Sequence, residues 1–461
     1  MLPKYSEDNI AAISSPFGIG GIAVIRCSGN KVFSIIQPLF FRKNKTSFDW
    51  NKIEYRKLYY GIILENNEVI DEVMFALFTQ PHSYTGENMV EIYCHGSIYV
   101  QQKILQLLIN KGCRIAEPGE FTTRAYLNGK INLAEAEAIG DIIHAESEAS
   151  HKLAMQQLRG GYIQLIEQLR ENILNFASLL ELELDFSEED VEFANRQQLR
   201  NLLTQTIQQI QTLTESFQLG NAIKSGVPVV IVGKPNAGKS TLLNVLLNEE
   251  KAIVSDIPGT TRDLIEDKLI INGILFRIID TAGIREAKDE IEKIGIDRAV
   301  HSIKKAMIVI LLQDINEPLE NFKQQFDLIK SQNPDASIIK VLNKADLQKS
   351  FDTLKLNNDV ISISAKTHTN LDKLKNKLVE IVISKGYQSH QPMVSNVRHY
   401  NELKQSLHFL EKSLNGLNNN ITTDIIAEDL KFAIQHLSNI TGNITSEDIL
   451  KNIFSKFCIG K

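Results

Sequence analysis

The segment VPVVIVGKPNAGKSTLLNVLLN, residues 227–248, decides the fold of the middle of the chain. An apolar run of strand length leads into Gly233–Ser240, which has the spacing G-x-x-x-x-G-K-S, and a helical pattern follows. This order is the full context of a phosphate-binding loop, because backbone N–H groups and the helix N-terminus then converge on the phosphates. Lys239 is expected to reach the β- and γ-phosphates and Ser240 to bind Mg²⁺.

Three later motifs, each directly after a predicted strand, indicate a guanine nucleotide: Asp280–Gly283 (DTAG), Asn343–Asp346 (NKAD) and Ser364–Lys366 (SAK). The Asp346 carboxylate can accept from the ring N–H and the exocyclic amine of guanine, whereas adenine offers neither donor at that edge. GTP is therefore the predicted ligand. Its predicted contacts in these motifs are Asn236, Ala237, Gly238, Lys239, Ser240, Thr241, Asp280, Thr281, Ala282, Gly283, Asn343, Lys344, Asp346, Ser364, Ala365 and Lys366.

A candidate switch segment, Gly259–Asp263 (GTTRD), lies between the phosphate loop and DTAG. A threonine there can complete Mg²⁺ coordination only while the γ-phosphate is present, so the order of the segment would depend on GTP. Thr261 is the predicted second Mg²⁺ ligand, a predicted GTP contact and, with Lys239, a predicted catalytic residue. Ile284 occupies the place of the water-positioning glutamine of Ras-like proteins, so hydrolysis must recruit another group. The nearest supply is the acidic run Glu286–Glu292, although a solvated helix start is the simpler explanation of any single acid in it.

Length and composition limit the class of protein. The chain has 461 residues, enough for about three domains of roughly 150 residues each. Hydrophobic residues make up 43% and charged residues 23%, which is typical of globular domains. No apolar run approaches the roughly 18 residues of a membrane span. The four cysteines form no CxxC pair, which favours a reducing cytoplasmic location. The net charge of −6 predicts that any nucleic acid is bound by a local patch or by another subunit.

The chain divides by composition into four parts, and the predicted fold class is multidomain α+β and α/β. Residues 1–125 alternate β-like runs (IAVIRC, EVMFALFT, MVEIYC) with one helical stretch, Tyr99–Asn110, and predict an α+β domain. Residues 126–220 are helical up to a stop expected at Gly220, 221–384 alternate β and α, and 385–461 are helical again. Insertion of a Ras-like P-loop domain into one helical domain is favoured. Two separate helical domains are the alternative.

The motifs together resemble the MnmE (TrmE) family of GTPases. The resemblance rests on the phosphate loop with Asn236, on GTTRD, on DTAGIREAKDEIEKIGI and on the C-terminal FCIGK, Phe457–Lys461. It extends to SPFGIGGIAVIRCSG, SYTGENMVEIYCHGS and EPGEFTTRAYLNGKINLAEAEAIGDII in the N-terminal part, and so covers essentially the whole chain. Ile19 departs from the family, whose members tend to carry a polar residue there. The ligand contacts of the neighbouring loop can therefore differ from those of the family.

The resemblance implies a tRNA modification GTPase. Such proteins form a homodimer through the N-terminal domain and a heterotetramer with an FAD-dependent MnmG-type partner. They add an aminomethyl or carboxymethylaminomethyl group to C5 of wobble uridines of certain tRNAs. The N-terminal domain would bind a 5-formyl- or methylene-tetrahydrofolate as the carbon source, with Arg26, Glu91 and Lys130 in contact and Lys461 nearby. Cations suit the glutamate tail of a folate, and a carboxylate suits the donors of its pterin.

The resemblance also implies how the missing glutamine is replaced. A K⁺ ion would be held by Asn236, Ser255, Ile257 and Thr260, which adds Ser255 and Thr260 to the predicted GTP contacts. The ion would place positive charge between the α- and γ-phosphates as charge develops there. Glu292 would orient the attacking water when two G domains meet.

Cys458 has two interpretations. In the family this cysteine is a candidate catalytic residue, since a thiolate could add to C6 of the uridine and activate C5. The alternative is a small apolar residue of the terminal helix that packs against the folate domain, where the apolar run FCIG would raise the pKa of the thiol.

Two other functions compete with tRNA modification. A GTPase that assists ribosome assembly typically carries a KH module, but no GxxG loop between paired helices follows the predicted G domain. A signalling switch would require slow hydrolysis and external activators.

Overall fold

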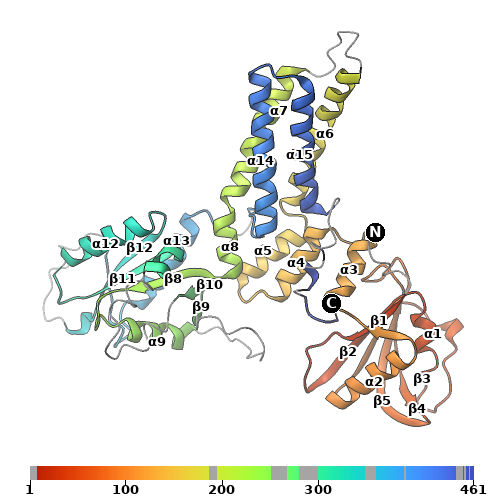
Figure 1. Ribbon diagram of the computed structural model, residues 1–461. Coiled ribbons are helices and arrows are strands. Elements are labelled where there is room, and N and C mark those ends of the chain that lie inside the picture. Colours follow the sequence, from red (N-terminus) through yellow and green to blue (C-terminus); the bar gives the residue numbers. More distant parts are fainter. Residues whose placement is uncertain are drawn as a thin grey trace. The chain divides into compact units, whose positions relative to one another are not determined.

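The computed structural model describes most of the chain (Figure 1): residues 8–185, 195–250, 267–279, 300–318, 320–347, 360–388, 391–442, 450, 453–455 and 457–460. The chain forms two compact units, Met1–Gly140 with Ser438–Lys461, and Asp141–Leu437. The four-part division at residues 125, 220 and 384 remains a prediction. Among the described residues, no helix combines the length and the apolar composition that crossing a lipid bilayer demands.

The first unit contains a seven-stranded sheet of order β3-β4-β5-β6-β2-β1-β7, antiparallel except for the parallel pair β1–β7. The runs IAVIRC, EVMFALFT and MVEIYC lie in β2, β5 and β6, as predicted. The strands are β1 (Asn9–Ile13), β2 (Gly20–Ser28), β3 (Phe40–Phe41), β4 (Leu58–Glu65), β5 (Glu68–Phe78), β6 (Met89–Gly96) and β7 (Cys113–Ile115).

Helices of the first unit are α1 (Val32–Ile36), α2 (Ile98–Asn110), α3 (Glu120–Leu127) and α4 (Leu133–Ile143), which begins in this unit. The predicted helical stretch is α2. Its residues Ile104 and Leu108 are buried in one core with Phe75 and Ile92 of the sheet. A helix with apolar residues four apart buries one face in this way.

The C-terminal residues belong to the same unit. Phe454 and Phe457 are buried beside Leu133 of α4. A Cβ at Gly140 would lie 3.0 Å from the Phe457 ring, so this glycine leaves room for the phenylalanine. Gly460 lies beside the residue that follows β1, since the Ser14 hydroxyl donates to the Gly460 carbonyl at 2.9 Å.

The second unit contains a six-stranded sheet of order β13-β12-β11-β8-β10-β9, parallel except for β9. The predicted strands before the four nucleotide motifs correspond to β8, β10, β12 and β13. The strands are β8 (Val227–Val232), β9 (Asp267–Ile271), β10 (Ile274–Ile278), β11 (Ile308–Asp314), β12 (Ser337–Asn343) and β13 (Val360–Ser362).

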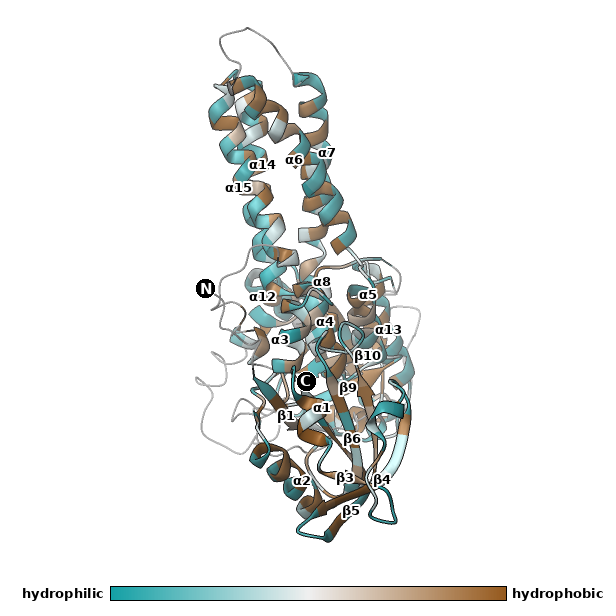
Figure 2. Ribbon diagram, turned by 90° about the vertical axis from the view of Figure 1, so that its right-hand side faces the viewer, coloured by the Kyte–Doolittle hydropathy of each residue, from teal (hydrophilic) through white to brown (hydrophobic). Residues whose placement is uncertain are grey.

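Helices pack on both faces of this sheet: α9 (Lys239–Glu250), α12 (Glu320–Gln332) and α13 (Leu371–Ser384). Alternate residues of β11 enter different cores. Ile310 joins the core that contains residues of α9 and α13, and Leu311 joins the core that contains residues of α12. Apolar residues on both faces of a strand are typical of a parallel sheet covered on both sides. Of this sheet, β9 and β10 are labelled in Figure 2, and both are mostly brown.

The remaining helices of the second unit are α5 (Glu148–Leu158), α6 (Ile163–Asp185), α7 (Arg196–Glu215), α8 (Phe217–Ser225), α14 (Val397–Asn418) and α15 (Thr423–Thr441). Figure 1 shows α6, α7, α14 and α15 as long helices side by side. Arg200 of α7 donates to the Leu417 carbonyl of α14 at 2.8 Å. The rings of Phe217 and Tyr400 stack with centroids 4.2 Å apart. Helices that precede and follow the six-stranded sheet in the chain therefore pack on each other.

The expected helix stop at Gly220 is wrong. Helix α7 ends at Glu215, and Gly220 lies inside the next helix, α8. A Cβ at Gly220 would lie only 2.3 Å from the Val394 carbonyl oxygen. The glycine is thus required by a close approach of another chain segment, which the sequence pattern does not reveal.

We predict that Gly220→Ala destabilises the protein. Helix propensity alone would make this change favourable by about 1 kcal/mol. The clash with a backbone carbonyl should outweigh that gain and cost about 2 kcal/mol, since overpacking of this kind forces backbone shifts. The midpoint of urea unfolding, followed by circular dichroism at the helical band, should fall.

Gly416→Ala in α14 is the matched control. A Cβ there would meet the Ile426 side chain at 3.2 Å, and a side chain can move more easily than a backbone carbonyl. A Gly220→Ala midpoint equal to or above that of Gly416→Ala would contradict the prediction.

Candidate functional site

The phosphate loop Gly233–Gly238 connects β8 to α9 and has a backbone that few residues adopt. Asn236 and Gly238 have φ values of 66° and 95°, in the left-handed region. A Cβ at Gly233 would lie 2.1 Å from the Leu312 carbonyl of β11, so only glycine fits there. The loop is therefore pressed against the neighbouring strand and opens at the carboxyl edge of the sheet.

Lys239 lies across this loop, as the motif predicts. Its Nζ donates to the carbonyls of Gly233 at 2.7 Å and Lys234 at 2.9 Å. Burial lowers the pKa of Lys239. A partly desolvated ammonium group at the start of a helix favours binding of an anion. Ser240 and Thr241 come next in the first turn of α9, and both are exposed.

The Asn343 side chain joins the three described nucleotide motifs. It is buried at the end of β12, with 2% of its surface exposed. Its Nδ2 donates to the Ala237 carbonyl of the phosphate loop at 2.9 Å, and its Oδ1 accepts from the Ala365 N–H at 3.0 Å. A Cβ at Gly238 would lie 2.3 Å from Nδ2, so the glycine allows the approach. Sequence reasoning treated Asn343 as a ligand contact, and the structure gives it two hydrogen bonds that hold the loops together.

The predicted guanine-recognition residues lie in the loops after β12 and β13. The Asp346 carboxylate is exposed, and its Oδ1 accepts from the buried Ser364 hydroxyl at 2.5 Å. The same hydroxyl accepts from the Thr367 N–H at 3.2 Å. Ser364 therefore fixes the orientation of Asp346, while Lys366 lies exposed in the same loop. An oriented, exposed carboxylate suits a ligand edge with two adjacent donors.

Lys344 binds a partner that sequence reasoning missed. Its φ is 66°, and its Nζ lies 2.7 Å from Asp314 Oδ2 at the end of β11. Burial would raise the pKa of Asp314, but hydrogen bonds from Lys344 and from the Asn316 backbone lower it overall. The sequence could have indicated this role for Asp314, because it ends the apolar run IVILLQD. Functional side chains of parallel sheets gather at the carboxyl ends of such strands.

Several predicted residues lie outside the described residues. They are Ser255, Ile257, Thr260, Thr261, Asp280, Thr281, Ala282, Gly283, Glu292 and Lys461. The assignments of Thr261 to Mg²⁺, of Glu292 to water activation and of Ser255, Ile257 and Thr260 to K⁺ therefore stay predictions. In the part of the chain that the structure covers, no group of three or more His, Cys, Asp or Glu residues is placed to hold a metal ion.

A second constellation lies on the sheet of the first unit. Arg26 of β2 and Glu91 of β6 are cross-strand partners, and their side chains pair at 2.8 Å with 21% and 13% of their surface exposed. The Tyr93 hydroxyl donates to the other Glu91 oxygen at 2.6 Å. Burial and this bond to Glu91 raise the pKa of Tyr93 to about 12. The structure thus brings together two of the predicted folate contacts and fixes both oxygens of the carboxylate.

The third predicted folate contact is linked to them through a loop. The Arg26 guanidinium lies 5.3 Å from the centroid of the Tyr84 ring. The exposed Lys130 side chain lies against Gly86, where an added Cβ would be 3.2 Å from Lys130 Cγ. Sequence reasoning missed Tyr84 and Tyr93, although both lie in the quoted run SYTGENMVEIYCHGS.

Cys458 is exposed and lies beyond the terminal helical turn. Its backbone carbonyl accepts from the Gly119 N–H at 3.4 Å. The packing that was considered for Cys458 is instead made by Phe454 and Phe457, which are buried. The interpretation of Cys458 as a packed apolar residue is therefore wrong, and the thiol is accessible.

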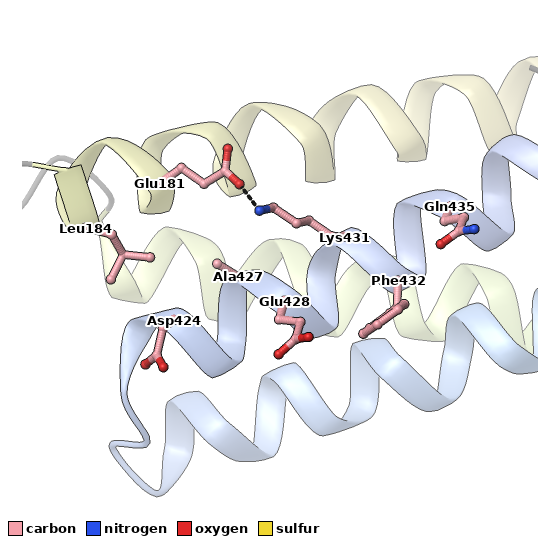
Figure 3. Close-up of a pocket in the computed structure, with 8 residues that line it drawn as sticks. All are labelled: Glu181, Leu184, Asp424, Ala427, Glu428, Lys431, Phe432 and Gln435. Carbon is pink, nitrogen blue, oxygen red and sulfur yellow. Dashed lines mark ion pairs between the residues drawn. The ribbon is translucent and has the colours of Figure 1, made fainter. Parts of the chain in front are cut away.

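A groove of about 600 Å³ lies between α6 and α15 (Figure 3). Glu181 of α6 pairs with Lys431 of α15 across it. The other lining residues are Leu184, Asp424, Ala427, Glu428, Phe432 and Gln435. None of these belongs to the predicted site, so the groove is separate from the phosphate loop in the structure.

Comparisons with known proteins cover the whole chain. The family model of the MnmE helical domain matches residues 133–458, and that of the GTP-binding protein TrmE N-terminus matches residues 9–130. Relatives named tRNA modification GTPase MnmE include that of Flavobacterium johnsoniae, 47% identical over 99% of this chain and 100% of the relative. That of Porphyromonas gingivalis is 46% identical over 100% of both chains.

Solved structures match a part of the chain. The G domain of the T. maritima FeoB iron transporter is 25% identical over 34% of this chain and 98% of that chain, with a TM-score of 0.26. A variant of Aquifex aeolicus Era bound to GDP·AlF4⁻ is 26% identical over 39% of this chain and 65% of that chain, with a TM-score of 0.25.

We predict that Asn343→Ala lowers the free energy of unfolding by about 3 kcal/mol even without any ligand. The change leaves the Ala237 carbonyl and the Ala365 N–H without their partner, at about 1–3 kcal/mol each where these groups stay buried. Urea unfolding of the full chain measures the loss. Asn316→Ala, which removes an exposed amide beside Asp314, is the control and should change little. Equal stability of the two variants would show that the Asn343 bridge contributes nothing.

Proposed function

This chain belongs to the MnmE family of tRNA modification GTPases, and from that premise we propose that it hydrolyses GTP to GDP and phosphate while taking part in tRNA modification. The observation that carries the proposal is identity of close to half over the full length of relatives with that name. The joined phosphate and guanine loops support it, because their geometry suits a guanine nucleotide.

We propose that GTP binds with Mg²⁺ at the edge of the sheet where β8, β12 and β13 end. Lys239 would contact the terminal phosphates, Asp346 the guanine, and Ser240 with Thr261 the metal ion. The position of Ser240 in the first turn of α9 supports its role.

We further propose that K⁺ supplies the positive charge that an arginine supplies in other GTPases. Asn236, Ser255, Ile257 and Thr260 would bind the ion, and Glu292 would orient the attacking water when two G domains meet. The exposure of Asn236 and its left-handed backbone within the phosphate loop support this.

The substrate chemistry is proposed to involve a folate in the N-terminal unit. Arg26, Glu91 and Lys130, with Lys461, would bind 5-formyl- or methylene-tetrahydrofolate. The carbon unit would reach C5 of a tRNA wobble uridine together with an FAD-dependent MnmG-type partner. The pairing of Arg26 with Glu91 supports a site where a cation and a carboxylate face one ligand.

The proposed assembly is a homodimer through the N-terminal domain, within a heterotetramer with the partner, in the cytoplasm. The packing of α7 and α8 on α14 supports the proposal that the P-loop domain is inserted into one helical domain. Cys458 is proposed as a nucleophile toward C6 of the uridine, and its exposure supports this role.

The tRNA role predicts a defect that mass spectrometry can detect. Wobble uridines of the affected tRNAs should lack the C5 group in a strain without this gene. Plasmid-borne wild-type protein should restore it, and Lys239→Ala should not, because GTP hydrolysis would be lost. Normal tRNA together with defective ribosomes would instead favour an assembly GTPase.

The K⁺ proposal predicts an ion-specific GTP turnover. At equal ionic strength the rate in K⁺ should exceed that in Na⁺ by roughly tenfold or more, as expected for loss of charge stabilisation in the transition state. Asn236→Ala should abolish the difference, and Asn316→Ala, an exposed amide on another loop, should retain it. Phosphate release in the two salts measures both. Equal wild-type rates in K⁺ and Na⁺ would contradict the proposal.

A further inference from the structure

A buried arginine in the first unit has no part in the proposed chemistry. Arg124 of α3 has 1% of its side chain exposed, yet it is surrounded by acids. Its guanidinium donates to Asp8 Oδ1 at 2.6 Å, Glu120 Oε1 at 2.9 Å and Glu87 Oε2 at 3.1 Å. Buried ion pairs are costly to desolvate and are often no better for stability than apolar packing. The main consequence of this network is therefore the geometry that it imposes on the segments it joins.

Glu87 carries the network into the loop between β5 and β6. Its Oε2 accepts from the Ser28 hydroxyl of β2 at 2.8 Å as well as from Arg124. Ser28 in turn lies 2.7 Å from the buried Thr85 hydroxyl. The Glu87 N–H donates to that same hydroxyl at 3.2 Å. One carboxylate thus ties the loop to both a strand and a helix.

The loop between β5 and β6 contains residues that contact two of the proposed folate-binding side chains, Arg26 and Lys130. Tyr84 lies beneath the Arg26 guanidinium, and its hydroxyl lies 2.8 Å from the Thr122 hydroxyl of α3. Two residues later, Gly86 has φ +80°, and its backbone lies against Lys130. A shift of the loop would therefore move the supports of Arg26 and Lys130 together.

We propose that Glu87 is a positioning residue of the one-carbon site: anchored by Arg124 and Ser28, it fixes the loop that sets Arg26 relative to Lys130 for binding a folate. The inference rests on the folate site proposed above. Arg26 and Lys130 would have to keep a fixed separation to contact one folate together, and small displacements of such groups cost much affinity. Glu87 does not touch the folate and acts through Tyr84 and Gly86.

The test is binding of 5-formyltetrahydrofolate to the full chain by isothermal titration calorimetry. Glu87→Gln keeps the size of the side chain but directs an N–H₂ group toward Arg124 or toward Ser28, so the loop should shift. We expect affinity to fall about tenfold. Ser28→Ala, which removes a single hydroxyl, should weaken binding about threefold and covers the case in which Glu87→Gln does not fold.

Glu72→Gln is the matched control. It makes the same substitution in β5, where Glu72 pairs with Lys43 at 3.2 Å and is 43% exposed. Its affinity for the folate should equal that of the wild type.

A double variant separates positioning from a general loss of structure. Because Glu87 acts in part through Tyr84, Glu87→Gln combined with Tyr84→Leu should weaken binding by less than the product of the two single fold-changes, since both loosen Arg26. Fold-changes that multiply would overturn the inference, as would wild-type affinity in both Glu87→Gln and Ser28→Ala. A wild-type chain that does not bind the folate would instead overturn the proposed site itself, and the inference with it.

Discussion

The nucleotide-binding half of the molecule depends on one buried amide. Asn343 has a single donor group and a single acceptor group to share, and both are used inside the protein, on the Ala237 carbonyl and the Ala365 N–H. The phosphate loop and the two loops after β12 and β13 therefore have one common reference point. Gly238 is part of the same constraint, since any side chain there would overlap the amide. Recognition of a base and of phosphates in one ligand requires these loops at a fixed separation, and a rigid link meets that requirement without using ligand binding energy to order them.

In the first unit, a loop near the proposed ligand is also held in place, but by ion pairs rather than by a neutral amide. Its loop between β5 and β6 is held by the carboxylate of Glu87, which requires the buried Arg124 and the neighbouring acids. A neutral amide suffices at Asn343 because it joins two backbone groups that need only one hydrogen bond each. An arginine is needed at Arg124 because Asp8, Glu87 and Glu120 converge from separate segments, and only a guanidinium offers enough donors in one plane. In both units, the groups proposed to contact a ligand are held in place by buried polar side chains. These buried side chains would not themselves contact the ligand.

The sequence predicted the parts of the fold that repeat locally. Apolar runs followed by glycine-rich or polar motifs placed β8, β10, β12 and β13 and the order of the nucleotide loops, because such patterns follow from side-chain periodicity. It failed where the cause was distant in the chain. Gly220 looked like a helix stop, but it faces the Val394 carbonyl. The partners of Lys344 and Arg124, and the exposure of Cys458, likewise depend on segments that only folding brings together. The assignment of Arg26 and Glu91 as folate contacts rests on family resemblance and is a proposal, while their contacts with Tyr84 and Tyr93 come from the structure.

The contributions that hold the nucleotide-binding sheet against α5 can be ranked by their approximate free energies. The β9–β10 hairpin contacts α5 through the Ala149 N–H, which donates to the Gly273 carbonyl at 2.9 Å. It also contacts the segment just before α5, where Lys268 pairs with Glu146 at 2.6 Å. That ion pair is 33% and 39% exposed, so it contributes about 1 kcal/mol at most. Apolar burial is larger: Ala149 and Leu153 share one core with Ile271 and Ile274, at about 1.5–3 kcal/mol for each large buried side chain. The hairpin is therefore held to α5 mainly by this shared core. Since β9 and β10 flank the chain positions of the switch segment and of DTAG, the packing of α5 and the geometry of these strands are energetically coupled.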